Sequence, residues 1–348
     1  MPIIPNFMEH LILLRLNQGP GPMLDVLGAL ACRAVSVALE LGVFGALSGG
    51  PLTAAEIARQ IEADERGATL LLEALEALGY VDKQDDRYAN TAMTVKWMLR
   101  GSPASFVGSL SFFEGLLERW GYLDESIRRG EPPMLVWEWF DQHPGGWRNY
   151  QAALLGMARM VADEVVARVK LPPTARRLLD VGGGHGLYSI KFCRRHPQLS
   201  ATVFDWPQAL EVAQETIAAE DMDGRVTVQE GDFWTDDLGS GYDVALLFNI
   251  IHMYLPDQNT ELLRKVAGAL NAGGLIVIMD QIAGKVSGPT AKAVARLQGL
   301  NLFNEVNGQT YATDEIAGWL MAAGFTNPRG ISLLKLPGFG LVVGTITG

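Results

Sequence analysis

A run of glycines directly after an apolar segment constrains this chain more than any other feature. The segment Leu178-Leu179-Asp180-Val181 leads into Gly182-Gly183-Gly184-His185-Gly186, and a helical pattern follows. Glycines let the backbone turn sharply and come close to a ligand. A strand, a glycine-rich turn and a helix in this order predict a nucleotide-binding loop in an α/β sheet. A tight turn without a ligand is the alternative, and the length of the whole motif disfavours it.

The spacing of the glycines indicates the kind of ligand. The dinucleotide fingerprint is G-x-G-x-x-G, whereas here the pattern is Asp-x-Gly-x-Gly-x-Gly, with Asp180 at the end of the strand. A carboxylate beside the loop suits a ligand with an ammonium or sulfonium charge and suits a pyrophosphate poorly. The spacing therefore argues against a nicotinamide-dependent dehydrogenase.

Two further acids end the next two predicted strands. Asp205 precedes Trp206 and is suited to accept hydrogen bonds from ribose hydroxyls, although alone it could simply cap a helix. Asp232 precedes Phe233, a pair that can meet an adenine amine while the aromatic ring flanks the base. Ligands bind at the carboxyl ends of strands in open α/β sheets. The three motifs together are therefore far more specific than any one of them.

The first hundred residues predict a helical module. Apolar side chains recur at three- and four-residue spacing over 24–47, Thr53 and Glu56 have capping-box spacing, a helix is expected over 66–78, and a hairpin follows at 80–89. This order of elements is that of a winged helix. Residues 1–100 hold eight Lys+Arg and twelve Asp+Glu, 8 − 12 = −4, and the whole chain carries −11. An acidic surface repels phosphates, so we expect a packing and dimerisation module and no nucleic-acid partner.

The rest of the chain divides at the paired prolines 172 and 173, where a helix must end. Before them, residues 101–170 predict further helices, with aromatic side chains mostly in the core and one or two lining a pocket. After them, residues 171–348 alternate strands and helices, which predicts a parallel sheet with helices on both faces. Strands are expected at 176–181, 200–205, 225–230, 242–251 and 274–280, and helices at 187–196, 207–219 and 258–271. Two strands at 331–336 and 340–346 predict a closing antiparallel hairpin.

Membrane and export signals are weak. The longest apolar stretch, 27–47, carries Arg33 and Glu40, and the N-terminus lacks the basic region of a signal peptide. The only two cysteines, Cys32 and Cys193, do not make a disulfide framework. We expect a cytoplasmic protein with no membrane partner.

The motifs at Asp180–Gly184, Asp205–Pro207 and Gly231–Phe233, with the closing hairpin, resemble class I S-adenosylmethionine-dependent methyltransferases. The N-terminal module narrows the resemblance to small-molecule O-methyltransferases of the plant caffeate/isoflavone type and their bacterial relatives, which modify polyketides and other secondary metabolites. The resemblance implies S-adenosylmethionine as cofactor, a small-molecule acceptor and a homodimer joined through the N-terminal domain. The cofactor-binding residues that it implies are Asp180, Gly182, Gly183, Gly184, Asp205, Trp206, Asp232, Phe233 and Asn249.

The same resemblance implies a catalytic pair. In the segment 248–257, His252 falls on the family's general base, and Asp280 corresponds to the acid that orients it. A second acid of the family aligns with Thr310, so that partner is absent here; Glu305 is nearby in the sequence but has no assigned role. His252 could instead cap a strand end. The remaining histidines lack metal-ligand spacing, so no metal site is expected.

The sequence therefore predicts methyl transfer from S-adenosylmethionine to a hydroxyl of an aromatic or polyketide-like metabolite, with His252 as base. Three alternatives stay open. The same fold could methylate carbon or nitrogen, it could bind the cofactor for a different reaction, or the N-terminal module could belong to a winged-helix regulator.

Overall fold

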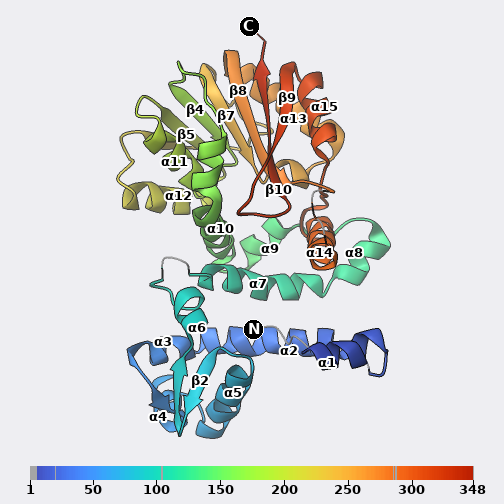
Figure 1. Ribbon diagram of the computed structural model, residues 1–348. Helices are drawn as coiled ribbons and strands as arrows, with labels where there is room; N and C mark the ends of the chain where they lie inside the picture. Colours follow the sequence, from blue (N-terminus) through green and yellow to red (C-terminus); the bar gives the residue numbers. More distant parts are fainter. Residues whose placement is uncertain (1–5, 20, 103–104, 285, 287, 348) are drawn as a thin grey trace. The chain divides into compact units, whose positions relative to one another are not determined.

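The computed structural model describes residues 6–19, 21–102, 105–284, 286 and 288–347. The chain forms two compact units, residues 1–114 and 115–348, which are taken one at a time (Figure 1). No single helix in the described ranges is long and apolar enough to cross a membrane, although one bent pair, Met23–Glu40 with Val43–Gly49, passes by length and composition.

The first unit is mostly helical with a small antiparallel sheet in the order β1-β3-β2. Its elements are α1 (Phe7–His10), η1 (Leu11–Arg15), α2 (Met23–Glu40), α3 (Val43–Ala46), η2 (Leu47–Gly49), β1 (Leu52–Thr53), α4 (Ala54–Gln60), α5 (Glu65–Ala77), β2 (Val81–Gln84), β3 (Arg87–Asn90), α6 (Ala92–Trp97) and the start of α7 (Val107–Trp120).

Local sequence explains how these helices begin and end. The predicted capping box is present: the Thr53 hydroxyl accepts from the Glu56 amide, and the Glu56 carboxylate accepts from the Thr53 amide. The single helix expected over 24–47 is wrong, because α2 ends at Glu40 and Gly42 follows with a φ of 82°. Glycine reaches that left-handed conformation readily, so the chain turns there. The winged-helix assignment stays a prediction.

The second unit is an α/β sheet of seven strands in the order β6-β5-β4-β7-β8-β10-β9. Its elements after α7 are α8 (Leu123–Arg129), α9 (Val136–Gln142), α10 (Gly146–Arg168), β4 (Arg177–Val181), α11 (Leu187–Arg195), β5 (Ser200–Asp205), α12 (Pro207–Ala219), β6 (Val226–Glu230), β7 (Tyr242–Phe248), η3 (Ile251–Met253), α13 (Pro256–Ala269), β8 (Leu270–Gln281), α14 (Pro289–Val306), α15 (Thr313–Ala322), β9 (Phe325–Ser332) and β10 (Phe339–Ile346).

The order of the strands positions a binding site. The chain starts in the centre at β4, builds outward through β5 and β6, then returns to the other side of β4 with β7 and β8. These five strands are parallel, and the order reverses between β4 and β7. Ligands of open α/β sheets bind at the carboxyl ends of the strands beside such a reversal. The glycine loop after β4 lies at this point.

Two apolar cores cover the two faces of the sheet. On one face, Leu178 of β4 and side chains of the adjacent strand β7 pack against α10, α11 and α12. On the other face, Leu179 of β4 packs against α13 and α15. In Figure 1 these two groups of helices flank the sheet on its left and right. Successive strand residues point to opposite faces, so the central strands, which are covered on both sides, are apolar at most positions.

The closing hairpin is confirmed, since β10 pairs antiparallel with both β8 and β9. Its first strand was expected too late: β9 spans Phe325–Ser332 rather than 331–336. Asn327 and Pro328 break the alternation of apolar residues, and the pairing with β10 is irregular between Val343 and Thr345. An edge strand tolerates proline because one row of its amides has no partner strand.

Candidate active site

The backbone of the glycine loop lies close to side chains of neighbouring segments. Gly182 and Gly184 have φ values of 66° and 47°. A Cβ on Gly182 would lie 2.3 Å from Cδ1 of Ile250, and one on Gly184 would lie 2.5 Å from Oε1 of Gln151. A larger residue would therefore be both strained and obstructed at these positions.

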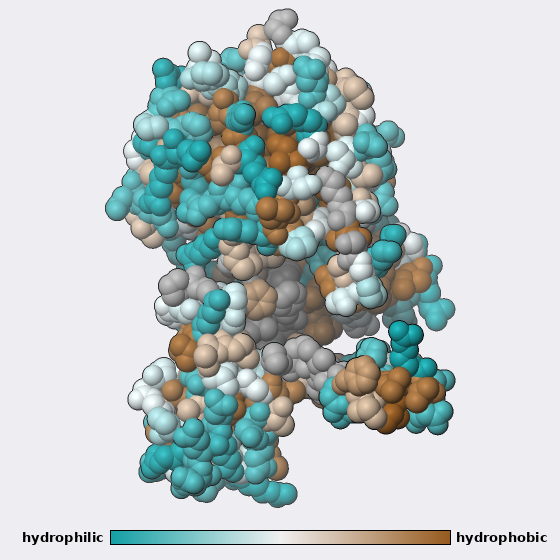
Figure 2. All heavy atoms as spheres, in the orientation of Figure 1, coloured by the Kyte–Doolittle hydropathy of each residue, from teal (hydrophilic) through white to brown (hydrophobic). Residues whose placement is uncertain are grey.

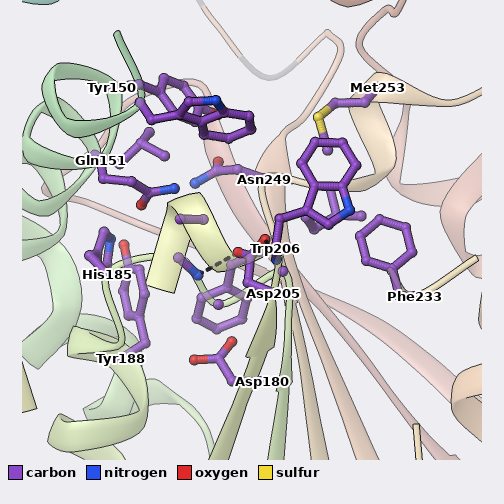
Figure 3. A pocket seen from close by; sticks show the side chains of 18 of the residues that line it. Tyr150, Gln151, Asp180, His185, Tyr188, Asp205, Trp206, Phe233, Asn249 and Met253 are labelled. Carbon is purple, nitrogen blue, oxygen red and sulfur yellow. Dashed lines mark hydrogen bonds between the residues drawn. The ribbon is translucent and has the colours of Figure 1, made fainter. Parts of the chain in front are cut away.

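A cleft with about 720 Å³ of empty space lies over this loop (Figure 3). Its walls come from α9, α10 and the segments that follow β4, β5, β6 and β7. The residues predicted from the sequence that line it are Asp180, Gly182, Gly183, Gly184, Asp205, Trp206, Phe233 and Asn249. The three sequence motifs thus meet at one site.

Asp205 ties the second motif to the first. Its Oδ2 accepts a hydrogen bond from the Gly184 amide at 2.8 Å, and its Oδ1 accepts from the Trp206 amide at 2.8 Å (Figure 3). Burial raises the pKa of Asp205 to about 6, although both amides lower it. Each carboxylate oxygen can accept more than one bond, so this group remains able to bind a ligand hydroxyl.

Asp180 is a second acid in the cleft wall, and it is buried. It is 2% exposed, and its Oδ2 accepts from the Ser189 hydroxyl at 2.7 Å. The pKa of Asp180 is raised to about 7. Burial is the main cause, the Ser189 hydrogen bond opposes it, and the negative charge of Asp205 adds to it. A cationic ligand in the cleft would favour the ionised forms of both acids.

The third motif contributes its aromatic residue to the cleft. Phe233 is among the lining residues, whereas Asp232 is not among those described as lining it. The Asp232 Oδ1 accepts from the Trp234 amide at 2.8 Å, and its own amide donates to Asp236. The carboxylate therefore organises the turn after β6, and its contact with a ligand stays a prediction.

The predicted catalytic pair is in direct contact. The Nδ1 of His252 lies 2.7 Å from Oδ1 of Asp280, and the His252 amide donates to Oδ2 of the same carboxylate at 3.3 Å. Asp280, near the end of β8, is 1% exposed, and His252, on η3, is 8% exposed. One carboxylate thus holds both the ring and the backbone of the histidine.

The turn after α14 supports His252 from the other side. The Gln309 amide donates to the His252 carbonyl at 2.9 Å. A Cβ on Gly308 would lie 2.0 Å from that carbonyl oxygen, so only glycine fits there. Glu305, which has no assigned role from the sequence, pairs with Arg119: its two carboxylate oxygens accept from the Arg119 Nε at 2.9 and 2.8 Å.

Sequence reasoning missed part of the cleft wall. Tyr150, Gln151 and Leu154 line it from α10, yet their spacing matches an ordinary core-facing helix. Trp137 and Trp147, among the aromatic side chains expected to supply one or two pocket residues, stack with centroids 5.5 Å apart. Both meet the Trp206 ring edge to face at 5.7 Å.

His185 lies inside the glycine loop, and its burial favours the neutral form of the ring. Burial lowers its pKa to about 4, and its Nδ1 accepts from the Leu187 amide at 3.1 Å. Across the residues that the structure describes, no cluster of three or more His, Cys, Asp or Glu side chains could hold a metal ion.

The sequence matches the models of a known family. The model of the O-methyltransferase domain matches residues 120–326, and that of the O-methyltransferase dimerisation domain matches residues 25–100. The chain belongs to the O-methyltransferase family. It is 32% identical over 326 residues to the 3-hydroxy-5-methyl-1-naphthoate 3-O-methyltransferase of Streptomyces sahachiroi, covering 91% of this chain and 92% of the relative. It is 30% identical to the tetracenomycin polyketide synthesis 8-O-methyl transferase of Streptomyces glaucescens, covering 90% and 93%.

A solved structure shows the same fold with a cofactor product. PigF with S-adenosylhomocysteine (SAH) superposes with a TM-score of 0.82 at 25% identity, covering 92% of this chain and 97% of that one. The protein is an S-adenosylmethionine-dependent O-methyltransferase. The sequence predictions of fold class, enzyme class and cofactor are confirmed, whereas the roles of single residues stay predictions.

The cleft of the O-methyltransferase fits this cofactor. Aromatic rings at Trp206 and Phe233 can flank an adenine, and Asp205 can accept from a ribose. The buried Oε1 of Gln151 faces the loop without a hydrogen-bond partner among the described residues. A cationic amino-acid group is a suitable donor for it.

Proposed function

We propose that this O-methyltransferase methylates a phenolic hydroxyl of an aromatic or polyketide-like acceptor, with His252 as general base and Asp280 as the residue that orients it. The 2.7 Å contact between His252 and Asp280 carries the proposal. The names of two relatives, which act on a hydroxynaphthoate and in tetracenomycin polyketide synthesis, support the acceptor class.

The cofactor lies along the cleft over the glycine loop. Asp205 accepts from its ribose, Trp206 and Phe233 flank its adenine, and the loop from Asp180 to Gly184 receives its methionine part. Asn249 and Asp232 complete the proposed cofactor contacts. When bound, S-adenosylmethionine supplies an electrophilic methyl group on its sulfonium.

His252 handles the acceptor's proton. A phenol has a pKa of about 10 and is mostly protonated at neutral pH, so an acceptor of weak acidity benefits from a base. In the tautomer with the proton on Nδ1, the Nδ1–H group donates a hydrogen bond to Asp280, and Nε2 is the nitrogen that accepts the phenol proton. Asp280 also stabilises the imidazolium that forms, as the acid does in a catalytic triad.

We further propose a cytoplasmic homodimer. Helix α2 supports the dimer, because Met23, Val26, Leu27 and Leu30 expose one apolar stripe at helical spacing. Cys32 and Cys193, neither in a disulfide, support a reducing compartment. The helical segment 101–170, between the dimerisation module 1–100 and the catalytic domain 171–348, contributes to the acceptor pocket through α9 and α10.

Incubation with S-adenosylmethionine and a hydroxynaphthoate tests the reaction. The expected products are SAH and an acceptor one methyl heavier whose NMR spectrum places the new methyl on oxygen. A new methyl on carbon or nitrogen, or cofactor binding without transfer to any hydroxylated aromatic acid, would overturn the proposal.

A further inference from the structure

Gln151 is a buried polar side chain without a role in the reaction described above. It lies on α10, is 3% exposed and lines the cleft. Its Oε1 has no hydrogen-bond partner within the described parts of the chain. A buried acceptor without a donor is costly, so such a group in a binding cleft points to a donor on the ligand.

The surroundings of Gln151 are built around its amide. Gly184 leaves room for it, because a Cβ there would lie 2.5 Å from Oε1 and 3.1 Å from Nε2. Across the cleft, the amides of Gln151 and Asn249 point toward one another (Figure 3). Asn249 is itself fixed, with a φ of 58° and its backbone amide bonded to the Met279 carbonyl at 2.8 Å.

The place of Gln151 along the cleft indicates which part of the cofactor it meets. In Figure 3, Phe233 lies at one end, Gln151 with His185 and Tyr188 lies at the other, and Asp205 lies between them. If the end at Phe233 holds the adenine and Asp205 binds the ribose, the amino-acid group of the cofactor reaches Gln151. That group carries an ammonium, which is a charged hydrogen-bond donor.

We propose that Gln151 is a cofactor-binding residue whose Oε1 accepts a hydrogen bond from the α-ammonium of S-adenosylmethionine. This inference rests on the proposed placement of the cofactor. It assigns to α10 a contact with the amino-acid end of the cofactor and so couples cofactor binding to the helix that also presents Tyr150 and Leu154.

Two ligands separate this contact from the rest of the site. SAH has the amino-acid group, and methylthioadenosine lacks it. By titration calorimetry, Gln151→Leu is expected to weaken SAH about 10-fold or more, the usual effect of losing a hydrogen bond to a charged group, and to leave methylthioadenosine nearly unchanged. Gln151→Glu, which keeps an acceptor for the ammonium, is expected to retain most of the SAH affinity.

Controls separate the outcomes. Asn149→Ala, which removes an exposed amide on the same helix, is expected to change neither affinity. Asp205→Ala is expected to weaken both ligands, because both contain the ribose. Equal weakening of both ligands by Gln151→Leu would show that the side chain only supports the loop and would overturn the inference. Failure of Asp205→Ala to weaken either ligand would instead overturn the placement of the cofactor.

Discussion

Asp180 and Asp205 both line the cleft, and burial raises the pKa of each carboxyl group. The pKa of Asp180 is raised to about 7 and that of Asp205 to about 6. Both values lie above the ordinary value of a carboxyl group, so without a ligand these two acids stay protonated up to a higher pH than a free carboxyl group does. A cofactor that brings positive charge and ribose hydroxyls favours the carboxylates.

Because of these two acids, the free energy of unfolding of the apo protein and the affinity for the cofactor are expected to change in opposite directions with pH. The folded state binds protons more tightly than the unfolded state between about pH 4 and pH 7, so the free energy of unfolding of the apo protein is expected to fall as pH rises through that window. The affinity for S-adenosylmethionine is expected to rise over the same window. Thermal unfolding and calorimetry at about pH 5 and pH 8 measure both. Parallel trends in the two quantities would contradict this.

The residues of the site differ in whether their positions could be predicted from the sequence. The two residues that the family resemblance implies as a catalytic pair, His252 and Asp280, are in contact although they are 28 positions apart, and their roles stay predictions. Gln151 escaped prediction because a polar residue on a helix is usually exposed, and only its packing against Gly184 reveals its place in the cleft. Asp232 is the opposite of Gln151: the sequence motif predicted it as a ligand-binding residue, but its carboxylate accepts a hydrogen bond from the Trp234 amide of its own turn.

At the scale of elements, a polar cluster joins α7 and α8 to α14. The Arg119–Glu305 ion pair is 5% exposed on each side, and the Ser126 hydroxyl donates to Asn304 at 2.7 Å. Asn304 also donates to the Arg119 carbonyl. Because the turn after α14 holds the His252 carbonyl, this cluster anchors the support of the base.

Removing one member of the ion pair is expected to destabilise the fold. Glu305→Ala leaves a buried guanidinium without its carboxylate, which costs about 3–5 kcal/mol in the free energy of unfolding. Denaturant unfolding measures the change. Glu211→Ala, at an exposed position on α12, is the matched control and is expected to stay within about 0.5 kcal/mol of the wild type. Equal effects of the two substitutions would contradict a structural role for the pair.

Elements were predicted well where periodicity was strong and poorly where one residue interrupted it. The five parallel strands follow apolar runs. In contrast, the expected strand 242–251 ends at Phe248, because Asn249 takes a left-handed conformation. The helix expected to reach 271 ends at Ala269, where β8 begins. These breaks depend on tertiary contacts, such as the bond from the Asn249 amide to the Met279 carbonyl, which no local pattern reports.

At the scale of the whole molecule, the exposed apolar surface of the N-terminal helices bears on how two chains associate. Apolar side chains gather over α1 in Figure 2, and Leu30 of α2 is 63% exposed. Exposed apolar stripes of this kind mark sites of association. The sequence predicted a dimerisation module, and the matched family domain agrees, whereas the faces that meet could not be read from the sequence because exposure is a tertiary property.

Light scattering tests the assembly. The wild type is expected to have about twice the 37.8 kDa mass of one chain. Leu30→Glu places a charge in the α2 stripe and is expected to shift the protein toward monomer. Leu334→Glu, at a position that is 75% exposed in the other unit, is expected to leave the mass unchanged. A monomeric wild type, or a Leu30→Glu variant that remains fully dimeric, would contradict dimerisation through α2.

Methyl transfer by the wild type and His252→Ala, compared over phenols of increasing hydroxyl pKa, tests general-base catalysis most directly. On a phenol of pKa about 10, His252→Ala is expected to lower kcat by about 10²–10⁴ while the SAH affinity stays unchanged, and the loss is expected to shrink on acidic phenols. His10→Ala, at an exposed histidine, is the control. Nearly full turnover of the weakly acidic phenol by His252→Ala would contradict the role of the histidine and of Asp280 with it.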